Sequence, residues 1–246
     1  MGEMIQLGNG DGGFGAYRSY PEDEIRGALI VIHEIWGLVD HIKEVADRFA
    51  AEGYLALAPD LLAAGGLDSA VVGRLGADLA DPAKRAQAQP RLREATAPLH
   101  APAAATRIKA ALKESFDYLD SAPEGEGRTG VVGYCFGGTY SFALAAAEPR
   151  LQAAVPYYGS ADLGPEELGR IACPVLAFYG EQDRRLMDGL PALRQRFAET
   201  GADFQAHVYP GTGHAFFNDT NPAVYNPAAA EDAWRRTLAF LHEHLE

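Results

Sequence analysis

The sequence predicts an α/β domain with a mostly parallel central sheet of about eight strands and helices on both faces. Two observations support this class. Short apolar stretches of strand length alternate with longer stretches whose apolar residues recur at helical spacing. Stretches such as Ala28–His33 are apolar at consecutive positions, as is typical of strands buried on both faces. With 246 residues in all, we expect 1–246 to form a single domain.

The expected strands are short and are bounded by glycine, proline or polar residues. In chain order they are Ile5–Leu7, Gly15–Tyr20, Ala28–His33, Tyr54–Ala58, Thr129–Gly133, Ala153–Tyr158, Pro174–Gly180 and Phe204–Tyr209.

Helices are expected between most of these strands. Asp40 is suited to cap a helix with apolar residues at positions 42, 45, 46 and 49, and Gly53 ends it. Further helices are predicted over 108–119, over Gly137–Ala147, around Leu190–Glu199 and at the C-terminus, where positions 234, 238 and 241 share one face.

Residues 61–105 interrupt the alternation. This stretch is rich in alanine, has weak periodicity and carries a net charge of +1, whereas the rest of the chain carries −14. We interpret it as an insertion that forms a lid, with a peripheral helical excursion as the alternative.

Composition excludes several classes of function. The net charge of −13 makes nucleic acid a poor partner. No apolar run is long enough to cross a membrane, and residues 1–11 show no pattern of a secretory signal. The only cysteines are Cys135 and Cys173, with no pair at metal or redox spacing, so we expect a cytoplasmic protein without a bound metal. Cys173, before an expected strand, is interpreted as a structural apolar residue.

The segment Gly133-Tyr134-Cys135-Phe136-Gly137 follows an expected strand and opens a helix of small residues. This is the context of a Gly-x-nucleophile-x-Gly turn, with cysteine as the nucleophile. The glycines avoid collisions across a sharp turn. The helix N-terminus is expected to lower the pKa of Cys135, and the N–H of Phe136 is placed to bind an oxyanion.

Two residues complete a triad in the order nucleophile, acid, histidine. Asp183 follows the strand Pro174–Gly180, and His214 follows the last strand. Carboxyl ends of parallel strands meet at one edge of a sheet, so these side chains are expected beside Cys135. Asp183 would orient the His214 ring, and His214 would exchange the proton with sulfur.

A further candidate ends the strand Ala28–His33. Glu34 is expected near the reacting centre, either as a second base or as a residue that fixes the loop. The N–H of Ile35 can supply a second oxyanion donor.

The chain resembles the dienelactone hydrolase family, also called carboxymethylenebutenolidases. The segments that carry the resemblance extend over nearly the whole chain in the correct order, and they are HEIWG (33–37), GYCFGG (133–138), GEQD (180–183) and GHAF (213–216). The resemblance implies an α/β-hydrolase fold, no cofactor, and opening of an enol-lactone ring.

For this chain, the resemblance implies a Cys135–His214–Asp183 triad and an oxyanion hole from Phe136 and Ile35. It implies that Glu34 takes the proton of the resting thiol when substrate arrives. Trp36 and Asn218 are the candidate substrate-binding residues. Family members use an arginine four residues after the catalytic histidine to hold the substrate carboxylate and the glutamate, but this chain has Asn218 there. A second family arginine lies in the lid, for which the candidates are Arg74, Lys84, Arg85, Arg91 and Arg93.

The sequence therefore predicts a cysteine-dependent hydrolase of small lactones or esters, as a monomer or small homo-oligomer. Two alternatives remain open. One is another carboxylesterase or acyl hydrolase of the same fold with a different substrate. The other is a binding protein without catalysis on this scaffold. A redox-sensing role for Cys135 is a lesser possibility.

Overall fold

The structure, a computed structural model, describes residues 2–8, 10–22, 24–81 and 83–246. Met1, Asn9, Asp23 and Pro82 fall within the expected domain, and Pro82 also within the expected insertion, but they lie outside the described residues.

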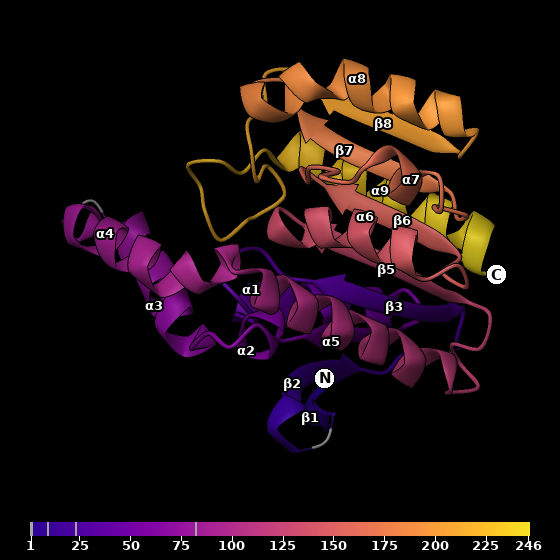
Figure 1. Cartoon of the computed structure of the whole chain (residues 1–246), viewed down its shortest axis with the longest axis horizontal. Coiled ribbons are helices and arrows are strands. Elements are labelled where there is room, and N and C mark those ends of the chain that lie inside the picture. The colour runs from indigo at the N-terminus through magenta and orange to yellow at the C-terminus, as the bar shows by residue number, and fades with distance from the viewer. Residues whose placement is uncertain (1, 9, 23, 82) are drawn as a thin grey trace.

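Eight strands form one sheet in the order β1-β2-β4-β3-β5-β6-β7-β8 (Figure 1). β2 pairs antiparallel with β1 and β4, and the remaining pairs are parallel. The fold class predicted from the sequence is confirmed, and each strand lies within two residues of its expected bounds. The strands are β1 Glu3–Leu7, β2 Phe14–Ser19, β3 Gly27–Ile32, β4 Tyr54–Pro59, β5 Thr129–Tyr134, β6 Ala153–Tyr157, β7 Val175–Gly180 and β8 Phe204–Tyr209.

Helices cover both faces of the sheet. Figure 1 shows α5, α6 and α8 in front of it and α9 behind. α1 lies on the same face as α9, because Phe49 of α1 packs against Trp234 of α9 with ring centroids 4.4 Å apart. The helices are α1 Asp40–Ala51, α2 Leu61–Ala64, α3 Ser69–Ala80, α4 Arg85–Thr96, α5 Pro102–Asp120, α6 Phe136–Ala147, α7 Pro165–Leu168, α8 Arg184–Thr200 and α9 Pro227–Leu245, with 3-10 turns η1 Gly10–Gly12 and η2 Ala97–His100.

Three helix starts differ from expectation, the first being that of α5, which begins at Pro102 and not near position 108. Val39, not Asp40, is the N-cap of α1; Asp40 is its first residue and pairs with Lys43 at 3.1 Å. A carboxylate in the first turn still interacts favourably with the helix dipole. α8 starts at Arg184, earlier than the expected helix around Leu190–Glu199, and continues through Pro191.

The expected insertion contains α2, α3, α4 and η2, and α5 starts at Pro102. α3 and α4 pack side by side and project from the body of the molecule (Figure 1). A small apolar cluster of Leu62, Leu67 and Val72 lies at their base, and Phe136 of α6 packs against it. The insertion therefore contacts the residue that follows Cys135.

The parallel strands bring the polar segments of interest to one edge of the sheet. Glu34, Cys135, Tyr158, Asp183 and His214 each follow the carboxyl end of a different strand, namely β3, β5, β6, β7 and β8. Among the described residues, no helix is long and apolar enough to span a membrane.

Candidate active site

Cys135 occupies the sharp turn between β5 and α6. Its φ of 56° lies in the left-handed region, which side chains other than glycine rarely adopt. A Cβ on Gly133 would lie 2.1 Å from the carbonyl oxygen of Gly137, and a Cβ on Gly137 would lie 2.3 Å from that of Ile32. The turn therefore requires glycine at both flanking positions, and it presents the sulfur at the end of the sheet.

The structure brings the three predicted triad residues together. The Sγ of Cys135 lies 3.1 Å from Nε2 of His214, and Nδ1 of His214 lies 2.5 Å from Oδ2 of Asp183. With Nδ1–H donating to the carboxylate, Nε2 is left as the acceptor that faces the sulfur. The arrangement has the geometry of a nucleophile, a base and an orienting acid.

The acid and histidine loops are held together by close backbone contacts. A Cβ on Gly180 would lie 2.3 Å from the carbonyl oxygen of Gly213, so glycine at 180 allows the two loops to touch. The N–H of Gln182 donates to the carbonyl of Thr212 at 2.8 Å. These contacts fix the separation of Asp183 and His214, and they are not evident from the sequence.

Asp183 is the N-cap residue of α8, but its side chain accepts no capping hydrogen bond. The carboxylate is therefore available to His214. Its position at the start of a 17-residue helix also stabilises its negative charge through the helix dipole.

The expectation that the pKa of Cys135 is lowered is wrong. The pKa of this thiol is raised to about 12, mainly by burial and in second place by the negative charge of Glu34. The backbone N–H groups of Phe136 and Ile35 and the charge of Arg185 lower the pKa, but by less. Desolvation thus outweighs the helix N-terminus, and the resting Cys135 is a thiol.

The two expected oxyanion donors are near the sulfur of Cys135. The N–H groups of Phe136 and Ile35 lie close enough to the sulfur of Cys135 to lower its pKa. Their loops are joined because the N–H of Gly137 donates to the carbonyl of His33 at 3.1 Å. Two N–H groups that converge on a nucleophile are placed to bind the oxygen of an acyl group attached to it.

Glu34 is buried beside this centre, with 3% of its surface exposed. Its Oε1 accepts a hydrogen bond from Tyr158 at 3.2 Å, and its Oε2 accepts one from Asn218 at 2.6 Å. Burial raises the pKa of Glu34 in spite of these donors and of the nearby His41 and His214. The expected role of Glu34 as thiol base stays a prediction, since the partner of the sulfur in this arrangement is His214.

Sequence reasoning missed Tyr158. The residue is buried, has a φ of 39°, and packs its ring 5.1 Å from that of His214. The sequence feature that could have identified Tyr158 is its position directly after β6, at the same edge of the sheet as the other site residues.

His33 was also given no role, although its ring connects the site to the insertion. Nε2 accepts a hydrogen bond from the N–H of Leu61 at 3.1 Å, so Nδ1 carries the proton and donates to the carbonyl of Glu34 at 2.6 Å. Burial lowers the pKa of His33, which favours this neutral form. The ring also stacks on Phe136, with centroids 5.6 Å apart.

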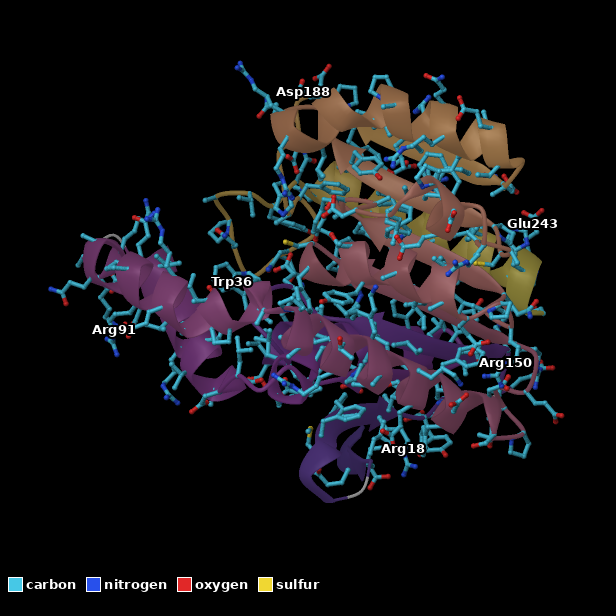
Figure 2. All side chains as sticks on the ribbon, viewed as in Figure 1. Arg18, Trp36, Arg91, Arg150, Asp188 and Glu243 are labelled. Atoms are coloured by element: carbon cyan, nitrogen blue, oxygen red, sulfur yellow. The ribbon has the colours of Figure 1, made fainter. Side chains whose placement is uncertain are left out.

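Trp36 contacts the insertion. A Cβ on Gly76 of α3 would lie 2.6 Å from the indole, so the helix packs directly on this side chain. Figure 2 places Trp36 where the α3–α4 pair joins the body, and Arg91 on that pair. The expected contact of Trp36 with substrate stays a prediction.

The candidate cations of the insertion are exposed. Lys84 pairs with Asp78 at 2.9 Å, and Arg85 donates to the carbonyl of Leu79. Among the described residues, no group of three or more His, Cys, Asp or Glu is arranged to hold a metal ion.

Comparison with known proteins gives consistent matches. The model of the dienelactone hydrolase family matches residues 14–245. A protein of Saccharolobus solfataricus named "Putative carboxymethylenebutenolidase" is 35% identical over 92% of both chains, and "Protein usf" of Aquifex pyrophilus is 31% identical over the full length of both. The crystal structure titled "Putative Dienelactone Hydrolase" from Klebsiella pneumoniae is similar with a TM-score of 0.83, at 26% identity over 99% of both chains.

Proposed function

The chain belongs to the dienelactone hydrolase family, and we propose that it hydrolyses small lactones or esters through a thioester on Cys135. As a member of this family it is a carboxylic ester hydrolase. The observation that carries the proposed mechanism is the 3.1 Å contact between Sγ of Cys135 and Nε2 of His214, whose ring Asp183 orients.

In the first half-reaction, Nε2 of His214 accepts the thiol proton and the sulfur attacks the carbonyl carbon. As the S–C bond forms, the carbonyl electron pair moves onto the oxygen, where the N–H groups of Phe136 and Ile35 bind it. The pair then returns, the C–O bond of the ester breaks, and the imidazolium gives its proton to the leaving alkoxide. Asp183 stabilises the imidazolium between these two transfers.

In the second half-reaction, water replaces the alcohol. Nε2 of His214 takes a proton from water, and the hydroxide attacks the thioester carbon. The same two N–H groups hold the second oxyanion. The C–S bond then breaks, and the proton passes from His214 to the sulfur, which restores the thiol. The product is a carboxylic acid, and for a lactone substrate the acid and the alcohol stay in one molecule.

Proton transfer from the thiol has two candidate acceptors. The contact with His214 supports the histidine. The family resemblance assigns the proton to Glu34 once substrate is present, and the charge of Glu34 does reach the thiol. We assign it to His214 in the arrangement described here, and the Glu34 variant below separates the two.

The surroundings of the site support two further proposals. Residues 61–105 would act as a lid, because their apolar cluster packs on Phe136 and α3 packs on Trp36.

A cytoplasmic location would keep Cys135 reduced, in keeping with two free cysteines.

The test is hydrolysis of 4-nitrophenyl acetate and a dienelactone, side by side, before and after treatment with iodoacetamide. The matched variants are Cys135→Ala and Cys173→Ala. We expect alkylation and Cys135→Ala each to abolish turnover, while Cys173→Ala stays active. Retained esterase activity in Cys135→Ala would overturn the mechanism, and no turnover of either substrate by the wild type would favour a binding protein.

A further inference from the structure

The edge of the sheet at β8 has backbone groups that point outward. β8 is the last strand in the sheet order, and its neighbour is β7 (Figure 1). The N–H of Val175 donates to the carbonyl of Asp203, and the N–H of Glu181 donates to the carbonyl of Tyr209. Alternate residues of a parallel strand face its partner, so these bonds use the odd-numbered positions of β8. The backbone groups at positions 204, 206 and 208 therefore face away from the sheet.

This edge has little of the protection that is usual for edge strands, which carry charges or proline or are covered by other segments. The sequence of β8, FQAHVY, contains no acidic residue, lysine, arginine or proline. Burial and the charge of Arg236 lower the pKa of His207, so this imidazole is neutral at pH 7. The exposed Arg194 of α8 donates to the carbonyl of Ala206 at 2.8 Å. An arriving strand could take the place of this side chain.

A groove of about 690 Å³ lies along the same edge, between α8 and α9. Its floor is largely apolar. Phe204 of β8 stacks on Phe197 of α8 with ring centroids 4.2 Å apart, and Phe240 of α9 and four alanines line the groove beside them. A strand added at this edge would gain backbone hydrogen bonds from β8 and apolar contacts from the groove.

The charges of α9 in this groove are self-complementary. Arg236 and Glu243 both line the groove and lie seven residues apart, which is about two helical turns. Ala239 and Phe240 lie midway between them on the same lining. A two-fold axis that passes near this midpoint would bring Arg236 of one copy toward Glu243 of the other, and the reverse. Figure 2 labels Glu243 near the C-terminal end of α9.

The groove also differs in charge from the chain as a whole. The chain has a net charge of −13, so two copies repel each other in most orientations. The groove lining carries Arg194 and Arg236 against one carboxylate, that of Glu243. Arg236 pairs with Asp232 through Nε, so its terminal nitrogens point beyond that pair. A second copy can therefore approach this face with less repulsion than the net charge would impose.

We propose that two copies of this chain associate through this face, with their β8 strands paired antiparallel across a two-fold axis. Such an axis makes each copy present the same segment to the other and relates the two strands in opposite directions. The sheet of one copy then continues into that of the other, and each copy covers the apolar groove of its partner. Arg194 gives up the carbonyl of Ala206 to the partner strand. The inference does not depend on the chemistry at Cys135.

The test measures association of the full chain by sedimentation velocity over a range of protein concentrations. The first variants are Arg236→Glu and Glu243→Arg, each of which would place like charges together at both contacts. Arg235→Glu is the matched control, because Arg235 is the adjacent exposed arginine, also pairs with Asp232 and lies outside the groove lining. The decisive sample is an equal mixture of the two groove variants. In a mixed dimer, each contact again joins an arginine to a glutamate.

A further variant tests strand pairing directly. Ala206→Pro removes an N–H that faces away from β7, so the ladder between β7 and β8 is kept, as proline on an edge strand allows. The ring then blocks the approach of a partner strand. Near-ultraviolet circular dichroism checks that this variant is folded, and if it is not, the mixture of charge variants still decides.

We expect the wild type and Arg235→Glu to be dimers at about 100 μM protein, and each groove variant to dissociate at least about tenfold more readily. The mixture should recover the association of the wild type, and folded Ala206→Pro should be a monomer. A monomeric wild type at this concentration would overturn the proposal. A dimer that both groove variants leave unchanged, a mixture that does not recover, or a folded Ala206→Pro that still dimerises would also overturn it.

Discussion

Asn218 donates from Nδ2 to Oε2 of Glu34 at 2.6 Å, across 184 residues of chain. The asparagine stands where the family resemblance expects an arginine, and it keeps one of that arginine's two functions, contact with the glutamate. It brings no charge, so Glu34 is held by neutral donors in a buried position. The ionisation of Glu34 is therefore sensitive to each donor.

Replacing Asn218 with leucine should raise the pKa of Glu34. The variant loses the 2.6 Å donor and leaves Tyr158 as the remaining side-chain donor to the carboxylate. Because the raised pKa makes the carboxylate protonate at higher pH, we expect the acidic limb of kcat/KM to move upward by about one unit. Thr220→Val is the control, since Thr220 bonds to Oδ1 of Asn218 and does not contact Glu34. An acidic limb that stays in place would show that Glu34 ionisation does not govern activity.

Replacing Glu34 with glutamine should make Cys135 more reactive in the absence of substrate. The negative charge of Glu34 raises the pKa of the thiol, so its removal should increase the thiolate fraction. In a Cys173→Ala background, we expect iodoacetamide to alkylate Cys135 about five to ten times faster at pH 7. Slower alkylation would instead identify Glu34 as the base that removes the thiol proton.

The nucleophile turn should not tolerate a side chain at position 133. A Cβ there would lie 2.1 Å from backbone, so Gly133→Ala should lower the free energy of unfolding by more than about 2 kcal/mol and abolish hydrolysis. Gly189→Ala in α8 is the matched control, because no atom lies within 4 Å of its added Cβ. It should raise stability by about 1 kcal/mol. Urea unfolding gives the free energy of unfolding of both variants. Equal changes in this free energy for Gly133→Ala and Gly189→Ala would contradict the prediction.

Cys173 should limit stability at alkaline pH. Burial raises the pKa of this thiol from 9.0 to about 12 in the folded state. Between these values the folded protein retains a proton that the unfolded chain has lost, so stability falls as pH rises, by about 1.4 kcal/mol per pH unit for this group. Cys173→Ala lacks this loss. We expect the stability difference between wild type and variant to shrink from pH 9 to 12 in chemical denaturation, whereas a constant difference would argue against it.

Much of this fold was predictable because the strands are distinctive. β3 is buried at every position, and its sequence GALIVI is a continuous apolar run that pattern analysis of the sequence detects. The helices of the insertion were harder to predict from the sequence. α4 is largely exposed, with Ala88 as its buried residue, and a helix surrounded by solvent needs no apolar periodicity.

The site residues also fall into those that the sequence predicts and those that it does not. Cys135, Asp183 and His214 were identifiable because each follows a strand in a fixed order, and the topology then brings them together. Tyr158 and the contact between Gly180 and Gly213 were not, because they depend on how loops from distant segments meet. The direction of the Cys135 pKa was wrong since burial, which a sequence does not reveal, outweighs the local helix dipole.

The imidazole of His33 joins two parts of the proposed enzyme through its two nitrogens. One nitrogen receives the N–H of Leu61, where the insertion begins, and the other donates to the carbonyl of Glu34, beside the oxyanion donor Ile35. If an arriving substrate displaces the insertion, the movement would shift the backbone at Glu34 and Ile35. The N–H of Ile35 is the group proposed to bind the oxyanion that forms in the next step. If the insertion acts as the proposed lid, this one ring would couple substrate entry to the position of the oxyanion donor. Because burial keeps that ring neutral, mild acid leaves the linkage intact.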